Sequence, residues 1–178
     1  MIEFEESEHI YRVKGKVVPS VTQIIGAVRP TRKWFTNHAT ERGRQVHLAL
    51  QYFDEGILED CPDEYLGYIA AYEFFKDSAD WMPLRTNVRL HNPKLKYCGA
   101  ADVTGLYSGK DAVLDFKTGE EDPGNIVQVA AYGMALKIDV RFVLYLRANG
   151  KFKLVPASGA IVENRWRSHV EVYYWYKG

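Results

Sequence analysis

Residues 97–119, which read YCGAADVTGLYSGKDAVLDFKTG, decide how the rest of the chain can be arranged. They predict a strand over residues 97–107, a turn over 108–111 and a second strand over 112–117. Ser, Gly, Lys and Asp in succession favour a chain reversal, and the segments on either side are rich in apolar residues. The apolar character of the second segment places it in the middle of a sheet.

The second strand of this hairpin ends in charged residues. Alternate residues of a strand share a face, so Asp115 and Lys117 lie together while Phe116 is buried on the other face. Asp102, on the preceding antiparallel strand, can meet them. Two carboxylates and a lysine at one sheet edge are costly to desolvate, which indicates a bound species such as a metal ion.

The composition fits one compact domain, over residues 1–178, with 47% hydrophobic and 13% aromatic residues. No apolar run is long enough to span a membrane, and residues 1–20 lack the apolar region of a signal peptide. The two cysteines, Cys61 and Cys98, are far apart in sequence, which argues against a disulfide framework, a zinc site or an iron–sulfur cluster and favours the cytoplasm. A net charge of zero argues against a generally basic nucleic-acid binder, although it leaves a local basic groove open.

Charge is unevenly distributed along the chain. Residues 54–64 hold six acids and no base, whereas residues 29–44 hold five bases and one acid. Two interpretations stay open: two solvated faces, or one face turned to phosphates and another turned to water.

The remaining pattern alternates helices and strands. We expect a hairpin over residues 9–18 that turns at Gly15, then a short helix over 21–28 capped by Ser20. A helix over about 63–79 should turn Leu66, Ile69, Ala70 and Phe74 toward the core. Further helices are expected over about 31–54, about 125–136 and from Ser158, where VEVYY also fits a strand, with strands over about 84–91, 140–147 and 152–155. The predicted fold class is α/β (α+β), with a mixed central β-sheet flanked by helices.

Four short motifs follow one another in the chain: RGRQVH ending at His47, GAAD ending at Asp102, DFK at residues 115–117, and QVAAY from Gln128 to Tyr132. In this order they resemble the PD-(D/E)XK nuclease superfamily, and in particular its RecB-like exonuclease branch. The pattern HxYxxxGxxxPSVTxI, from His9 to Ile24, is similar to that of phage-encoded and mitochondrial-genome-maintenance exonucleases of this branch. The resemblance implies a restriction-endonuclease-like core.

The resemblance also implies roles for the motif residues. Asp102, Asp115, the backbone carbonyl of Phe116 and His47 would be ligands of Mg²⁺ or Mn²⁺, and an imidazole ligand favours Mn²⁺. Lys117 would hold the attacking water, and Gln128 and Tyr132, four residues apart on one helix face, would border the site. Simpler accounts stay open: a salt bridge between Asp115 and Lys117, and core packing for Tyr132.

One position departs from the family pattern. Family members commonly carry a glutamate on the strand before the GAAD segment, where this chain has Asn87, so binding of a second ion is in doubt. Gly99 either allows a close approach of backbone or DNA or marks a plain strand bulge. Five residues are candidates for phosphate contact and base stacking: Arg42, Arg44, Arg32, Lys33 and Trp34.

These observations predict a Mg²⁺- or Mn²⁺-dependent DNA exonuclease that acts on single-stranded DNA or duplex ends. Such an enzyme would serve DNA recombination and repair or phage DNA processing, with a phage or host recombination protein as a possible partner and no membrane association. Two alternatives are a catalytically weak DNA-binding module that retains the nuclease fold, and an unrelated α+β protein whose motif matches are coincidental.

Overall fold

The computed structural model describes residues 2–29 and 37–178, so the predicted DNA contacts Arg32, Lys33 and Trp34 lie outside the described residues. Its centre is a five-stranded sheet in the order β4-β5-β6-β7-β8, antiparallel except for the parallel pair β6–β7. The strands are β4 (Trp81–Asn92), β5 (Tyr97–Tyr107), β6 (Lys110–Lys117), β7 (Val140–Leu146) and β8 (Phe152–Pro156). A smaller antiparallel sheet joins β1 (Ile2–Glu5), β2 (Ile10–Val13) and β3 (Lys16–Val18).

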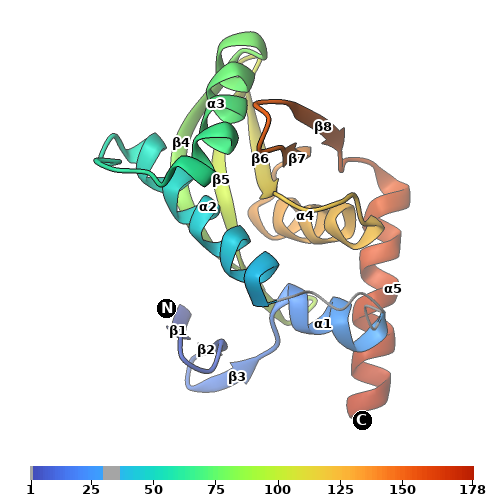
Figure 1. Ribbon diagram of the computed structural model, residues 1–178. Coiled ribbons are helices and arrows are strands. Elements are labelled where there is room, and N and C mark those ends of the chain that lie inside the picture. Colours follow the sequence, from blue (N-terminus) through green and yellow to red (C-terminus); the bar gives the residue numbers. More distant parts are fainter. Residues whose placement is uncertain (1, 30–36) are drawn as a thin grey trace.

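Five helices accompany the sheets in the described part of the chain: α1 (Val21–Val28), α2 (Asn37–Glu55), α3 (Asp63–Ser78), α4 (Pro123–Leu136) and α5 (Ala160–Lys177). Figure 1 shows α2 and α3 along β4 and β5, while α4 and α5 lie together on the opposite side of the central strands. The predicted class, a mixed α/β sheet flanked by helices, is confirmed. None of the helices in the described ranges has the length and apolar character that a membrane crossing needs.

Two hydrophobic clusters hold these layers together. One cluster joins α1, α4 and α5 to the sheet through residues such as Ile24, Val127 and Trp166. The other joins α2 and α3 to the opposite side through residues such as Leu50 and Phe75. Because alternate residues of β6 enter different clusters, the strand is buried on both faces, as its apolar sequence predicts.

Several element boundaries agree with the sequence. The N-terminal hairpin turns at Gly15, and Ser20 caps α1 through a capping box with Gln23. The segment that follows Ser158 is a helix, not a strand. Helix α4 begins at Pro123, two residues earlier than expected, because Asp122 accepts a hydrogen bond from the Gly124 backbone N–H and proline suits the first helical turn.

The predicted core face of α3 is wrong in part. Leu66, Ala70 and Phe74 are exposed. The buried residues are Tyr68, Ile69, Ala71, Tyr72 and Phe75. Gly67 lies within α3, and a β-carbon there would lie 1.7 Å from the Ala148 carbonyl oxygen. Contact between Gly67 and the β7–β8 turn therefore sets the rotation of α3, and no pattern within the helix shows that turn.

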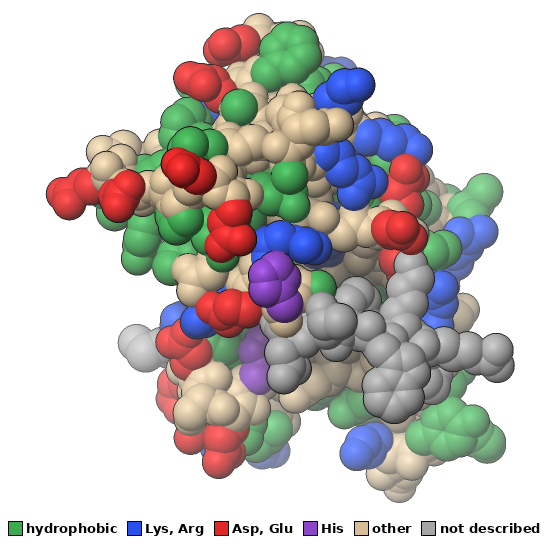
Figure 2. Space-filling view, in the orientation of Figure 1, with side chains coloured by type: hydrophobic (Ala, Val, Ile, Leu, Met, Phe, Trp, Pro, Cys, Tyr) green, Lys and Arg blue, Asp and Glu red, His purple; other side chains and the backbone are tan. Residues whose placement is uncertain are grey.

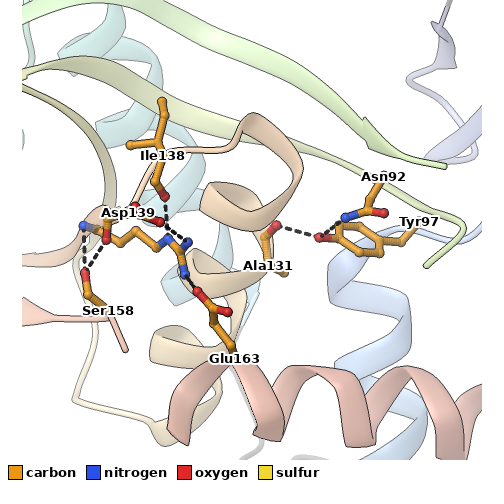
Figure 3. Close-up of polar contacts among 8 residues, drawn as sticks. Asn92, Tyr97, Ala131, Ile138, Asp139, Ser158 and Glu163 are labelled. Carbon is orange, nitrogen blue, oxygen red and sulfur yellow. Dashed lines mark hydrogen bonds and ion pairs between the residues drawn. The ribbon is translucent and has the colours of Figure 1, made fainter. Parts of the chain in front are cut away.

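Buried polar contacts fix α4 between its neighbours (Figure 3). Arg141, 2% exposed, donates through Nε to the Ile138 carbonyl at 2.6 Å and through Nη1 to Glu163 of α5 at 2.8 Å. The Tyr97 hydroxyl donates to the Ala131 carbonyl at 2.7 Å. Arg141 thereby ties β7 and the loop after α4 to α5, and Tyr97 of β5 holds α4 itself.

Candidate catalytic site

The hairpin of β5 and β6 has a two-residue turn, Ser108 and Gly109, both with positive φ. Its ladder runs regularly from the pair Tyr107–Lys110 to the pair Val103–Leu114. Beyond that pair the Asp102 side chain takes over, because its Oδ2 accepts a hydrogen bond from the Phe116 backbone N–H at 2.7 Å. The predicted hairpin is confirmed, and the acidic residues lie where its regular ladder ends.

A local distortion in β4 lies opposite Asp102. Thr86 pairs with Val103 and Val88 pairs with Ala101, so Asn87 is the residue opposite Asp102. Asn87 has φ of 45°, a left-handed conformation that asparagine tolerates better than most residues. In β5, Ala101 and Val103 flank Asp102. Val103 packs in the cluster with α2 and α3, whereas Ala101 packs in the other cluster, so the two residues point to different faces of the sheet. Asparagine in this position therefore has a backbone role, because it takes a conformation that most other residues avoid.

His47 of α2 meets Asp102, with 3.2 Å between Nδ1 and Oδ1. Burial alone lowers the pKa of His47, but the Asp102 carboxylate outweighs burial and the pKa is raised. Burial likewise raises the pKa of Asp102, and the imidazole and the Lys117 ammonium outweigh it, so that pKa is lowered. The two shifts agree in direction and describe an imidazolium–carboxylate pair.

Asp115 and Lys117 share a face of β6, as predicted, and form an ion pair. Asp115 is 1% exposed, and burial raises its pKa to about 6. Burial lowers the pKa of Lys117, but Asp115 and Asp102 outweigh this effect and raise it. The lysine is therefore a cation held by two carboxylates at the end of the strand.

Helix α4 borders this pair with a glutamine and a tyrosine. Gln128 Nε2 donates to the Tyr132 hydroxyl at 2.8 Å and, at 3.4 Å, to Asp115 Oδ1. Tyr132 is 4% exposed, and burial raises its pKa well above the usual value. Tyr132 thus packs in the core and also borders the site. The ring also accounts for Gly99, where a β-carbon would lie 2.8 Å from Tyr132 Cε1.

The donors at the site have the chemistry that Mg²⁺ or Mn²⁺ requires: carboxylate oxygens, a backbone carbonyl and an imidazole. Asp115 Oδ2 is buried, and among the described residues its partner is the Lys117 ammonium. As the side chains lie, however, no three His, Cys, Asp or Glu residues in the described ranges surround a common point. A metal ion would therefore require the pairs Asp115–Lys117 and Asp102–His47 to separate.

The predicted DNA contacts on α2 are less favourably placed. Arg44 is exposed and forms an ion pair with Glu41, with 3.0 Å between Nη2 and Oε1. Arg42 is half-buried, and its Nε has no hydrogen-bond partner among the described residues. Gly43, between them, lies against Thr118, since a β-carbon there would be 3.7 Å from Thr118 Oγ1. This distance is an ordinary contact, so Gly43 is not required by close packing.

The loop that follows Lys117 is held by contacts that were not predicted from the sequence. Arg147 Nη1 donates to the Gly119 carbonyl at 2.5 Å, and Lys153 pairs with Glu121 at 2.6 Å. The Tyr145 hydroxyl accepts a hydrogen bond from Asn125 Nδ2 at 3.1 Å. Tyr145 belongs to β7, Arg147 directly follows it and Lys153 belongs to β8. They could be placed only with the register of the parallel β6–β7 pair, which no local pattern determines.

A scan against protein-family models and a search of curated proteins return no match. Among solved structures, the alkaline exonuclease LHK-Exo from Laribacter hongkongensis is similar, with a TM-score of 0.50 and 11% identity over 88% of this chain and 86% of that chain. LHK-Exo in complex with dAMP gives the same TM-score at 10% identity, with 89% of this chain and 87% of that chain covered. A candidate exonuclease from Eubacterium rectale gives a TM-score of 0.51 at 14% identity, with 89% and 74% covered.

The chain has the fold of these exonucleases. At identities of 10–14% the likeness concerns the arrangement of helices and strands. Any activity has to be argued from the chain's own side chains.

Proposed function

We propose that this protein is a metal-dependent deoxyribonuclease that degrades DNA from single-stranded or free ends. The observation that carries the proposal is the meeting of Asp102, Asp115 and Lys117 at the point where β5 and β6 separate. Such a group is costly to bury without a bound substrate or ion. The exonuclease fold supports the same conclusion.

Asp102, Asp115, the Phe116 carbonyl and His47 are the residues that would hold Mg²⁺ or Mn²⁺. When bound, the ion would lower the pKa of a coordinated water and neutralise charge on a non-bridging phosphate oxygen. Asp102 is already oriented by the Phe116 backbone N–H, and this bond keeps its second oxygen free to face His47.

Lys117 has the position to act on the reacting groups. Its side chain is 21% exposed, so the ammonium, which pairs with Asp115, can turn to a phosphate when that pair separates. In hydrolysis a water oxygen forms a bond to phosphorus, the bond to the leaving oxygen breaks, and the water proton passes to solvent or to the leaving oxygen. Lys117 orients that water and offsets the negative charge that grows on the phosphoryl oxygens. Gln128 and Tyr132 hold Asp115 from the α4 side.

We favour an exonuclease over a sequence-specific endonuclease because no separate reading domain accompanies the sheet in the described part of the chain. A role in DNA recombination and repair or in phage DNA processing fits such an activity. The second candidate is a catalytically weak DNA-binding module, and the observation that favours it is Asn87, which replaces a carboxylate with a neutral amide.

The test is degradation of 5′-labelled, 3′-labelled and covalently closed circular DNA, each with Mg²⁺ and with Mn²⁺. We expect release of label from free ends, dependence on the metal, and loss of at least about a hundredfold in rate for Asp115→Asn. The matched control is Asp111→Asn, an exposed carboxylate at the start of the same strand. Cleavage of closed circles would refute the preference for ends, and a metal-independent or Asp115-independent activity would refute the proposed site.

A further inference from the structure

The β7–β8 hairpin carries three basic residues, Arg147 and Lys151 in its turn and Lys153 in β8, which we call the basic hairpin residues. Lys117 of β6 is in register with Tyr145 of β7, and Tyr145 is in register with Lys153 of β8. These three residues therefore form one row across the sheet. Neighbouring strands lie about 4.8 Å apart, which places the Cα atom of Lys153 roughly 10 Å from that of Lys117.

The other two basic hairpin residues, Arg147 and Lys151, extend this row outward. The Arg147 backbone N–H donates to the Lys151 carbonyl at 2.9 Å, so the two residues face each other across the turn. By strand alternation they share a face with Tyr145 and Lys153, which is also the face of Asp115 and Lys117. Figure 2 shows Lys and Arg side chains gathered over the part of the surface where Figure 1 places β8.

The interactions that the basic hairpin residues now make are weak and easily replaced. Lys153 pairs with Glu121, but the two side chains are 59% and 47% exposed, and exposed pairs contribute little to stability. Arg147 uses one N–H group on the Gly119 carbonyl and keeps others for a second acceptor. The ammonium of Lys151 has no ion-pair partner among residues 2–29 and 37–178. The loop that supplies Gly119 and Glu121 leads directly away from Lys117.

We propose that a DNA strand leaves the catalytic site across the β7–β8 hairpin, with its phosphates bound to the basic hairpin residues. This inference rests on the proposed nuclease function and adds the path of the substrate. Lysine and arginine bind phosphates without regard to base sequence, as an enzyme that degrades arbitrary ends requires. Glu121 presents a carboxylate to Lys153 and competes there with an arriving phosphate.

The experiment measures fluorescence anisotropy of a labelled single-stranded oligothymidylate in EDTA, over a range of salt concentrations. The test variant is Lys151→Gln/Lys153→Gln. The control is Lys110→Gln/Lys137→Gln, which removes the same charge elsewhere. Lys110 begins β6, seven residues and thus roughly 23 Å from Lys117, and Lys137 ends α4. A third variant, Glu121→Gln, frees Lys153.

The double hairpin variant should weaken binding on the order of tenfold and reduce the salt slope by about 1.4, since each phosphate contact on a single strand contributes about 0.7. Glu121→Gln should tighten binding by up to about fivefold. If the hairpin variant and the control weaken binding equally, the path is wrong while the nuclease proposal stands. If the wild-type protein binds no DNA in EDTA, and Asp115→Asn binds none with Mg²⁺, the proposed function itself fails.

Discussion

The backbone of Gly99 lies against the ring of Tyr132, with only 2.8 Å between Tyr132 Cε1 and the place of a β-carbon on Gly99. Gly99→Ala should therefore displace a buried ring and lower the free energy of unfolding by about 1–3 kcal/mol. It should also loosen the contacts of Gln128. Urea denaturation measures the first effect, and the rate of DNA degradation measures the second. Gly26→Ala is the control, because nothing lies within 4 Å of a β-carbon there and alanine favours the interior of α1.

Gly67 makes a still closer contact, since its added β-carbon would meet a backbone carbonyl that cannot rotate away. Gly67→Ala should push α3 away from the β7–β8 turn and cost more than Gly99→Ala, about 3 kcal/mol or more. Thermal unfolding followed by circular dichroism compares the two variants. An unchanged melting temperature would show that α3 does not depend on this contact.

Metal binding should stabilise the folded protein. With Mn²⁺ at about a hundred times its dissociation constant, the expected gain is about 2.7 kcal/mol, or roughly 5–10 °C in melting temperature for a chain of this size. His47→Ala and Asp115→Asn should each reduce that shift. His169→Ala changes a half-buried histidine of α5 whose Nδ1 lies 2.7 Å from the Arg165 carbonyl of its own helix, and it should leave the shift intact. A shift of equal size in all variants would place the ion elsewhere.

A buried polar group behind the site ties α2 to α3 and β4. The Tyr72 hydroxyl donates to Asp54 at 2.7 Å and accepts from Trp81 Nε1 at 3.0 Å, while the Asp54 side chain is 2% exposed. Tyr72→Phe leaves both partners short of a hydrogen bond and should cost about 1–3 kcal/mol in urea denaturation. Tyr52→Phe, on the exposed side of α2, should be nearly neutral. Equal values for the two variants would contradict a role for the hydroxyl.

The hydrogen bond from Tyr97 to Ala131 should make stability depend on pH in the alkaline range. Burial raises the pKa of Tyr97 to about 12, above the ordinary value of 10.0. The raised value means that the folded state holds this proton more tightly, so its contribution is complete below pH 10 and is lost as pH rises through about 12. Tyr97→Phe should be less stable than wild type by about 1 kcal/mol at pH 7, and the difference should shrink toward pH 12. A difference that is constant with pH would contradict this account.

Much of the architecture could be predicted because local rules determine it. The turn at Ser108 and Gly109, the cap at Ser20 and the alternation that puts Asp115 beside Lys117 each depend on a few neighbouring residues. The rotation of α3 could not be predicted, because the carbonyl of Ala148, about eighty positions from Gly67 in the chain, decides it. The spacing of apolar residues along a helix cannot by itself show which side of the helix meets a distant turn.

The residues of the candidate site also fall into those that local motifs predict and those that depend on distant pairing. The gathering of Asp102, Asp115, Lys117 and Gln128 follows from short motifs and one antiparallel hairpin. The backbone conformation of Asn87 depends on the pairing of β4 with β5, and the placement of Arg147 and Lys153 depends on the parallel pair β6–β7. Such long-range pairings leave no mark in a short window of sequence, so residues that act through them were missed or were given another role.

The short connection between β4 and β5 has a consequence for the tolerance of the chain to insertion. Asn92 accepts backbone hydrogen bonds from Lys94 and Leu95 and so holds the length of this connection. One residue more or fewer here would slip β5 by one position against β4 and turn its side chains to the opposite face. Asp102, five residues and roughly 17 Å along the strand, would then point away from His47. Loops usually accept changes of length, but this one sets the register on which the carboxylate depends.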